Sequence, residues 1–297
     1  MKKNSFMAWV EAARPKTLPA SISPVLVACA LAWQNGMFKA IPAFLCLMVA
    51  LLAQIASNFA NDYFDFKKGA DTEERLGPER AVASGWIEPK AMLRATFIAL
   101  GLACLCGCLL LFFSGWELIP VGIAIALCVL AYSAGPFPLA YNGLGDICVL
   151  LFYGVIPVCF TYYIQAGNFS LLSLILSLAI GLLSVNILIV NNYRDYEQDK
   201  KARKRTTIVL FGRRFGLISY LLNGSVAFFL ALPLVVGKDR LTWQIALLGF
   251  FYVVFYFVWR EMTRTEGKAL NNILGKTGML VFLFSVILSA ILVFTPQ

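Results

Sequence analysis

The chain has 297 residues, of which 60% are hydrophobic and only 14% are charged. A soluble globular domain has about a quarter of its residues charged, so the composition excludes an ordinary soluble protein. The net charge of +9 would suit a nucleic-acid-binding protein, and the positions of the charges along the chain decide that question.

Long apolar segments recur along the whole chain, separated by short polar breaks. They cover residues 18–34, 41–60, 95–113, 117–134, 147–164, 171–190, 217–236, 243–259 and 277–295. Each is close to the ~20 residues that a helix needs to cross ~30 Å of hydrocarbon. The ten-residue alternation of a membrane β-barrel does not appear in the sequence. We therefore predict an all-α polytopic membrane protein with nine transmembrane helices.

Nine spans divide the basic residues very unevenly between the two sides of the membrane. All but three of the 25 Lys and Arg residues fall in the N-terminal segment or in loops at about 67–94, 194–214 and 260–276, the exceptions being Lys39, Lys238 and Arg240. Short basic loops remain cytoplasmic, so we predict a cytoplasmic N-terminus and no nucleic-acid partner. The segment before the first span lacks the apolar core of a cleavable signal peptide.

Two pairs of segments match each other at a common offset of 130 residues. "NDYFDF" (61–66) aligns with "NNYRDY" (191–196), and "YNGLGDICVLLF" (141–152) aligns with "NNILGKTGMLVF" (271–282). A shared offset indicates duplication, so we predict two four-helix repeats plus one helix, with residues 1–297 forming a single domain. Duplicated bundles commonly place a binding site between their halves.

The first acidic motif closes the predicted second helix. At ~100° per residue, Asn58, Asn61, Asp62 and Asp65 share one face of that helix. Asp71 follows a few residues later, after a glycine that can turn the chain back. Acidic residues at this depth usually face a bundle interior or a water-filled cavity.

The second acidic motif closes the predicted sixth helix in the same way. Asn191, Asn192, Asp195 and Asp199 fall within a similar arc if the helix continues through them. Carboxylates with neighbouring amide oxygens and bases suit Mg²⁺, which prefers few carboxylates together with water and phosphate. The two motifs therefore predict a Mg²⁺–diphosphate clamp at the membrane surface.

Several other polar features have a simpler explanation. The run "KKARKR" (200–205), taken by itself, is interpreted as solvated loop charge. The eight cysteines lie in apolar stretches and the chain contains no histidine, so a zinc site or a disulfide framework is not expected.

The acidic motifs and their surroundings resemble the UbiA superfamily of intramembrane aromatic prenyltransferases. Four blocks carry the resemblance, in order along the chain: "ARPKTLPASISPV", "NDYFDFKKGADTEERLGPERAVASGWI", "YSAGPFPLAYNGLGD" and "NNYRDYEQDKKARKRT". Within the superfamily they look like the prenyltransferases of menaquinone synthesis that act on 1,4-dihydroxy-2-naphthoate. Members that act on 4-hydroxybenzoate carry basic residues where this chain has "PFPLAYNG", which counts against ubiquinone synthesis.

The helical register, the neighbouring charges and the resemblance together suggest roles for individual residues. Metal and catalytic roles fall to the acidic motifs, diphosphate binding to nearby bases, and the acceptor or prenyl pocket to a third set. The metal and catalytic set is Asn61, Asp62, Asp65, Asp71, Asp195 and Asp199; the diphosphate set is Lys67, Lys68, Arg75, Arg80, Arg194 and Lys201; the pocket set is Arg14, Asn58, Tyr63, Tyr132, Tyr141, Asn142, Asp146, Asn191, Asn192 and Tyr193.

The resemblance further implies a reaction. Mg²⁺ would assist transfer of a polyprenyl group from polyprenyl diphosphate to 1,4-dihydroxy-2-naphthoate, with release of diphosphate and CO₂, at the cytoplasmic face of a bacterial inner membrane. Another aromatic acceptor is the nearest alternative, and a secondary transporter is the alternative from a different class. The sequence leaves the prenyl chain length, the oligomeric state and the residue that removes a phenolic proton open, with Asp146 as a candidate for the last.

Overall fold

The computed structural model describes residues 3–69, 76–235 and 242–295, and these residues contain helices but no β-strand. The main helices are α1 (Phe6–Ala13), α2 (Leu18–Gln34), α3 (Ala40–Lys67), α4 (Pro89–Leu110), α5 (Leu118–Ala131), α6 (Gly145–Leu150), α7 (Ile156–Ala166), α8 (Leu171–Arg194), α9 (Tyr196–Lys201), α10 (Thr207–Phe211), α11 (Arg213–Ala231), α12 (Thr242–Met262) and α13 (Leu270–Phe294). Short 3₁₀ or π segments occur at η1 (Pro15–Thr17), η2 (Leu139–Tyr141), η3 (Leu151–Val155), η4 (Leu232–Leu234) and η5 (Gly267–Ala269).

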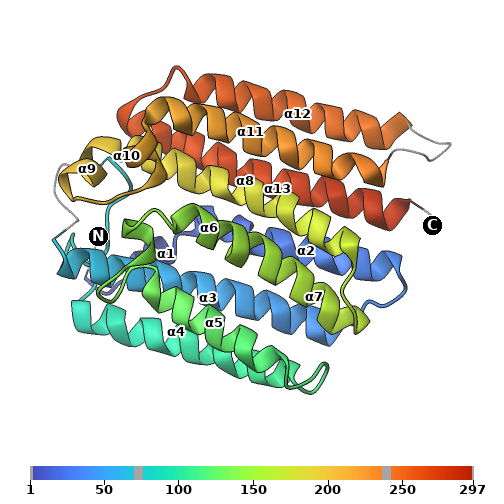
Figure 1. Cartoon of the computed structure of the whole chain (residues 1–297). Coiled ribbons are helices and arrows are strands. Elements are labelled where there is room, and N and C mark those ends of the chain that lie inside the picture. The colour runs from blue at the N-terminus through green and yellow to red at the C-terminus, as the bar shows by residue number, and fades with distance from the viewer. Residues whose placement is uncertain (1–2, 70–75, 236–241, 296–297) are drawn as a thin grey trace.

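The long helices lie side by side along one common direction (Figure 1). Helix α13 packs against α2 and α8, and α11 packs against α8 and α12. Buried apolar residues of α2, α7, α8 and α11–α13 form the largest core cluster, while many large apolar side chains, such as Phe97, Phe112 and Phe250, remain exposed on the outside. A helical bundle with an apolar exterior satisfies its backbone hydrogen bonds internally, as a bilayer requires.

The helices confirm a multi-pass membrane protein but not the count of nine spans. Eight helical stretches in the described part of the chain are long and apolar enough to cross a bilayer. The predicted fourth span is helix α5, which has only 14 residues and extends about 21 Å at 1.5 Å per residue. It is too short to cross ~30 Å of hydrocarbon alone.

The fifth span is interrupted, which the sequence did not predict. Helices α6 and α7 are joined by the π-helical segment η3, which contains Gly154. A methyl group on Gly154 would lie 2.5 Å from the Cα of Gly181 in α8. These two helices therefore approach each other so closely that only glycine fits at the contact.

Of the two matched pairs of segments, the acidic motifs both lie at the end of a long helix, but the glycine pair sits differently in its two helices. Gly145 begins α6, whereas the matching Gly275 lies inside α13, which continues without a break from Leu270 to Phe294. The repeat and the single-domain boundary 1–297 therefore remain predictions.

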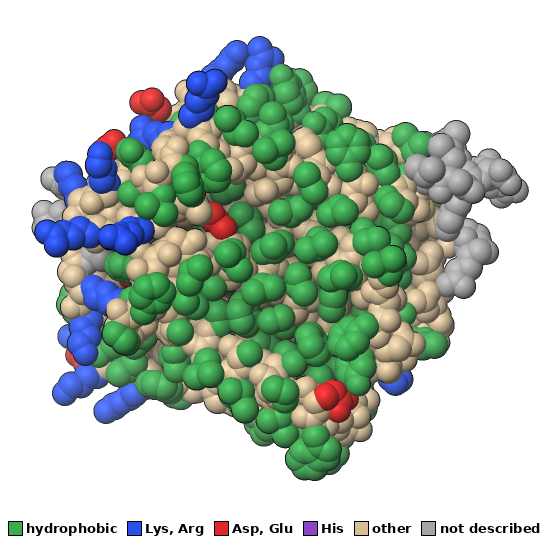
Figure 2. Space-filling view, viewed as in Figure 1, with side chains coloured by type: hydrophobic (Ala, Val, Ile, Leu, Met, Phe, Trp, Pro, Cys, Tyr) green, Lys and Arg blue, Asp and Glu red, His purple; other side chains and the backbone are tan. Residues whose placement is uncertain are grey.

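Basic side chains gather at one end of the bundle. Figure 2 shows Lys and Arg concentrated at the end where Figure 1 has α9, α10 and the N-terminus, with an apolar surface along the helices. Helices α3 and α8 both finish at this end (Figure 1), so the two acidic motifs meet the basic surface.

Candidate active site

A cavity of about 700 Å³ lies inside the bundle. At one end it is lined by acids of both motifs, among them Asp65 and Asp199, and further along it is lined by apolar residues such as Leu110, Leu118 and Ile164. Leu110 ends α4, Leu118 begins α5, and Ile164 lies near the end of α7, which is the far end of the bundle in Figure 1. The cavity therefore runs along the helices from a charged end to an apolar end.

Helix α3 places the first acidic motif as the helical register predicts. Asn58, Asn61, Asp62 and Asp65 all line the cavity. The helix ends at Lys67, and Gly69 then adopts a left-handed backbone conformation with φ of 65°, which turns the chain away as a glycine can.

The two carboxylates of this motif have different partners. Asp62 is 2% exposed, and its two oxygens accept the backbone N–H groups of Ala81 and Val82 at 3.0 and 3.1 Å. Asp65 accepts a hydrogen bond from the Tyr141 hydroxyl at 2.9 Å and lies 3.3 Å from the guanidinium of Arg80. Asp62 thus anchors the loop that carries Arg80, while Asp65 faces the cavity.

The second motif departs from the predicted single helix. Helix α8 ends at Arg194, Asp195 forms the link, and Asp199 lies in the separate short helix α9. The Asp199 N–H still donates to the Asp195 carbonyl at 2.8 Å, so the two acids remain one turn apart and both line the cavity.

Arg194 is the most enclosed charge of the site. Its side chain is 1% exposed, and it grips Asp195 with two hydrogen bonds of 2.7 and 2.6 Å. The same guanidinium donates to Asn191 and to Asn271 of α13 at 2.8 and 2.7 Å. Arg and carboxylate fit each other in this two-bond geometry, so Arg194 fixes the position of Asp195.

The two motifs are electrostatically linked across the charged end of the cavity. Burial raises the pKa of Asp199 to about 6, and the negative charges of Asp195 and Asp65 add to that rise while Lys204 opposes it. Lys204 lies 3.5 Å from Asp199, and its ammonium is also 4.6 Å from the centre of the Tyr141 ring. Tyr141 therefore stands between Asp65 and the cation that pairs with Asp199.

Most of the predicted site residues surround this cavity. Its lining contains Arg14, Asn58, Asn61, Asp62, Asp65, Arg80, Tyr132, Tyr141, Asp146, Asn191, Asn192, Asp195 and Asp199. Arg14 is held in a left-handed backbone conformation between α1 and α2, and the Asn58 amide ties α3 to this junction through the Ala13 carbonyl at 2.9 Å.

Other predicted residues lie elsewhere. Lys67 and Lys201 are exposed outside the cavity lining, and Arg194 is buried behind Asp195. Lys68 is outside the cavity lining but beside its charged end, because its ammonium donates to the Ser133 carbonyl at 2.6 Å and lies 4.6 Å from the centre of the Tyr141 ring. Asn142 donates to the Pro138 carbonyl, and Tyr63 packs against the cluster around Phe59 and Met92. Tyr193 is buried with the Arg213 guanidinium over its ring. Asp71 and Arg75 fall outside the described residues.

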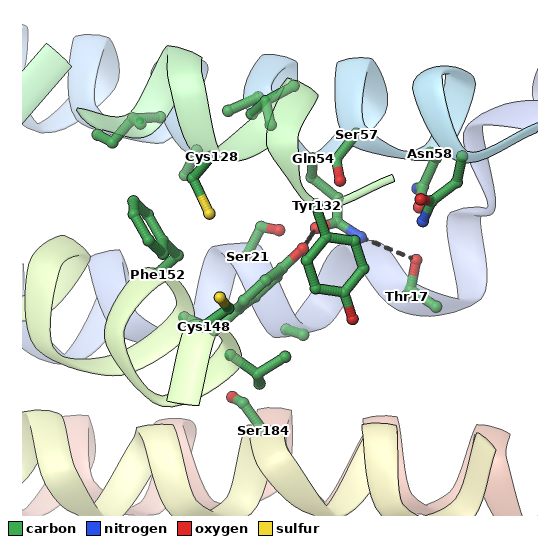
Figure 3. Close-up of a pocket in the computed structure, with 18 of the residues that line it drawn as sticks. Thr17, Ser21, Gln54, Ser57, Asn58, Cys128, Tyr132, Cys148, Phe152 and Ser184 are labelled. Atoms are coloured by element: carbon green, nitrogen blue, oxygen red, sulfur yellow. Dashed lines mark hydrogen bonds between the residues drawn. The ribbon is translucent and has the colours of Figure 1, made fainter. Parts of the chain in front are cut away.

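The sequence interpretation missed several residues that line the cavity. Lys204 belongs to the run interpreted as solvated charge, yet Arg203 takes a left-handed conformation with φ of 55° and the next residue then faces Asp199. Deeper in the cavity, Tyr153 donates to Gln54, which donates to Thr17 at 3.3 Å (Figure 3). A glutamine in the middle of an apolar helix was the sequence signal for this second group.

The charged end suits a hard cation that keeps other ligands of its own. Among the described residues, no three acidic side chains converge as ligands of one ion. Asp65 and Asp199 nevertheless turn buried carboxylates to the cavity, and Asn61 and Asn192 of its lining carry amide oxygens, whereas the Asn191 oxygen accepts from Arg194. One or two carboxylates with water and phosphate oxygens are the donors that Mg²⁺ prefers, so this donor set fits Mg²⁺.

The molecule is thus a multi-pass helical membrane protein with an internal cavity that is acidic at one end and apolar along its length. Comparison with known proteins gives the family: the chain belongs to the UbiA prenyltransferase family, which it matches over residues 21–294.

Curated relatives are similar over most of their length. The chain is 37% identical to 1,4-dihydroxy-2-naphthoate octaprenyltransferase of Escherichia coli (strain K12), over 78% of this chain and 84% of that protein. It is 37% identical to the enzyme of the same name from Haemophilus influenzae over 74% of each chain. The enzyme of that name from Bacillus subtilis is 30% identical over 87% of this chain and 81% of its own.

Solved structures share the fold. A UbiA homolog from Archaeoglobus fulgidus bound to DMAPP and Mg²⁺ aligns with a TM-score of 0.67 and 17% identity, covering 97% of this chain and 99% of that one. A digeranylgeranylglyceryl phosphate synthase aligns with a TM-score of 0.62 and 20% identity, covering 96% and 98%.

Proposed function

We propose that this protein transfers a polyprenyl group from polyprenyl diphosphate to 1,4-dihydroxy-2-naphthoate, releasing diphosphate and CO₂ and giving demethylmenaquinone. The observation that carries the proposal is a cavity that has carboxylates of both acidic motifs at one end and an apolar lining beyond. The similarity to three enzymes named for the same acceptor supports the choice of acceptor.

The charged end would hold the diphosphate. We assign Asn61, Asp65 and Asp199 to Mg²⁺, which when bound neutralises the charge that builds on the leaving diphosphate. Asp195, whose two oxygens already accept hydrogen bonds from Arg194, supports this site through its position. Asp71 remains a predicted additional ligand from the sequence. We assign Asp62 to anchoring the Arg80 loop, because both of its oxygens already accept backbone N–H groups.

Cationic side chains at this end would stabilise the leaving group. Arg80 and Lys204 line the cavity beside Asp65 and Asp199, and each can donate to a phosphate oxygen. Preorganised donors of this kind stabilise developing charge without rearranging during the reaction. Lys67, Lys68, Lys201 and Arg75 remain predicted contributors from the sequence, and Arg194 acts through Asp195.

The apolar part of the cavity would hold the prenyl chain and exclude water. Ionisation of an allylic diphosphate leaves a carbocation that water would quench, so the walls around it must be dry. Phe152, Phe160 and Leu118 are among the residues that line this part. The aromatic acceptor would then lie between the charged end and this apolar region, close to Arg14, Asn58 and Tyr132.

The same proposal sets the orientation in the membrane. Because the basic side chains concentrate at the end that bears the acidic motifs, the positive-inside rule supports a cytoplasmic active site and N-terminus. We propose the cytoplasmic membrane of a bacterium as the location, in keeping with the bacterial relatives.

A test of this function must distinguish it from two alternatives. Another aromatic acceptor would use the same charged end with different contacts near Tyr132. A secondary transporter would place its acids in broken helices at the membrane midplane, whereas here Asp65 lies in the last turn of α3 and Asp195 follows the end of α8.

The experiment incubates the purified full chain in detergent with 1,4-dihydroxy-2-naphthoate and a polyprenyl diphosphate, with Mg²⁺ or with EDTA. We expect equal amounts of prenylated quinol and diphosphate, formed only with Mg²⁺. Diphosphate release that needs 4-hydroxybenzoate or homogentisate instead would overturn the assigned acceptor. Folded protein without turnover on any of these acceptors would favour the transporter.

A further inference from the structure

Asp146 is a carboxylate of the cavity wall whose two oxygens are in different situations. It lies in the first turn of α6 and lines the cavity. Its Oδ2 accepts a hydrogen bond from the Thr207 hydroxyl of α10 at 2.6 Å. Its Oδ1 is buried and has no hydrogen-bond partner among the described residues.

A purely structural role accounts for only one of these oxygens. The bond to Thr207 ties α6 to α10 and needs Oδ2 alone. A buried polar atom without a partner destabilises the folded protein, and such atoms are rare enough in native proteins to require an explanation. A small rotation of the carboxylate toward the cavity that Asp146 lines would let the O–H group of a bound molecule supply the missing partner of Oδ1.

The surroundings of Asp146 favour a phenol as that molecule. The Tyr132 hydroxyl lies 3.6 Å from the place that a methyl group on Gly145 would take, next to Asp146 in the chain. Figure 3 shows Tyr132 projecting into the cavity, with Ser21, Phe152 and Ser184 around the same space. The Ser21 hydroxyl is buried and also has no partner among the described residues, so this region combines a few polar groups with apolar walls, as small-molecule sites do.

The segment after α9 places this site near the charged end. Lys204 pairs with Asp199, and Thr207, three residues later, bonds Asp146. Three residues of chain span at most about 10 Å. One short segment of chain therefore contacts both Asp199 and Asp146, and both acids line the same cavity.

We propose that Asp146 is a catalytic base, whose Oδ1 accepts the proton of the acceptor hydroxyl next to the ring carbon that becomes prenylated. The proposal rests on the function proposed above and adds the residue that handles the phenolic proton. Thr207 is its positioning residue, since it fixes the carboxylate through the other oxygen.

Asp146 takes one proton from the acceptor and later gives it back, so the reaction consumes no net proton. As the hydroxyl loses its proton to Asp146, the ring carbon that bears the carboxylate bonds to the allylic carbon, and the oxygen becomes a ketone. The product of this step is a β-keto carboxylate, which loses CO₂ because the electron pair of the broken bond passes to the ketone as an enolate. That enolate is the aromatic phenolate, and protonated Asp146 returns the proton to its oxygen.

The test compares Asp146→Asn with the wild-type full chain on 1,4-dihydroxy-2-naphthoate and on an analogue fluorinated on its second ring, whose hydroxyl is more acidic. Positioned proton transfer contributes about 10²–10⁴-fold, so we expect kcat to fall by that factor with the natural acceptor. The KM for polyprenyl diphosphate should stay within twofold. The ratio of wild-type kcat to Asp146→Asn kcat should be several-fold smaller with the fluorinated acceptor, because a more acidic phenol loses its proton more readily without a base.

Two further variants keep the test decisive. Thr207→Val keeps the Asp146 carboxylate but removes the hydrogen bond that orients it. Loss of one hydrogen bond should lower kcat by up to about tenfold. This variant replaces Asp146→Asn in the test if Asp146→Asn does not fold. Glu117→Gln, an acid at the opposite end of the bundle that bonds Ser114 and Tyr163, should behave as wild type.

The inference is overturned if Asp146→Asn stays within threefold of wild type, or if its deficit is the same with both acceptors. In either case wild-type turnover would leave the proposed function standing. Absence of wild-type product with 1,4-dihydroxy-2-naphthoate would instead overturn the proposed function itself.

Discussion

The two acidic motifs look alike in sequence, and each contains one acid that is anchored by neighbouring groups and one that has only longer cation contacts. The anchored acid stands at a different position in each motif. In the first, Asp62 is anchored by two backbone N–H groups, and Asp65 meets the cavity with a phenol and a more distant arginine. In the second, Asp195 is anchored by Arg194, and Asp199 is held by Lys204 at 3.5 Å.

This difference shows that equivalent positions in a sequence match need not share a role. The alignment pairs Asp65 with Asp195, but the anchored acid is Asp62 in one motif and Asp195 in the other. The acids with longer cation contacts are Asp65 and Asp199, which lie 3.3 Å from Arg80 and 3.5 Å from Lys204. We expect these two to contribute most to catalysis and the anchored acids to contribute through position.

The largest effect is expected from removing the charge of either cavity-facing acid. Asp65→Asn and Asp199→Asn keep the shape of the side chain but lose the charge that attracts the metal. Loss of one electrostatic contact of this kind costs about 10²–10³-fold in kcat, and the Mg²⁺ concentration for half-activity should rise. Initial rates over a Mg²⁺ titration measure both, with Glu117→Gln as the matched control, and rates within threefold of wild type would refute the division of roles.

Breaking the ion pair between Arg194 and Asp195 should lower the unfolding free energy more than it lowers the rate of turnover. Arg194→Met leaves Asp195 as an unpaired charge in a site where Arg194 is 1% exposed, and breaking a buried pair costs about 3–5 kcal/mol. Denaturation in mixed micelles should show this loss of unfolding free energy.

The double variant Arg194→Met with Asp195→Asn is the control for that measurement. It removes both charges together, so it should recover much of the lost stability. A single variant as stable as wild type would show that the pair contributes little and that Arg194 is available for another role.

Local sequence features predicted the parts of the site that depend on helix geometry. The register of α3 brought Asn58, Asn61, Asp62 and Asp65 to one wall of the cavity, because residues three and four apart share a helix face. The basic end of the bundle also followed from the distribution of Lys and Arg.

Contacts between distant segments could not be derived in this way. Arg194 meets Asn271 of α13, and Asn271 in turn donates to the Leu76 carbonyl, a pairing set by how whole helices pack. The position of Lys204 depends on a left-handed residue before it, and the short α5 and the π segment η3 depend on packing against neighbouring helices. Helix periodicity carries no information on any of these.

The smallest effect, and the sharpest test of the comparison, is expected for Asp62→Asn. The amide offers one oxygen where the carboxylate offers two, so one of the N–H groups of Ala81 and Val82 loses its acceptor. The cost is about 1–3 kcal/mol for a buried donor left without a partner, and it falls on the loop that carries Arg80. Hydrogen exchange at Ala81 and Val82 should accelerate, and the KM for polyprenyl diphosphate should rise while the Mg²⁺ requirement stays that of wild type. A raised Mg²⁺ requirement with unchanged exchange would identify Asp62 as a metal ligand, and the two motifs would then share their roles position by position after all.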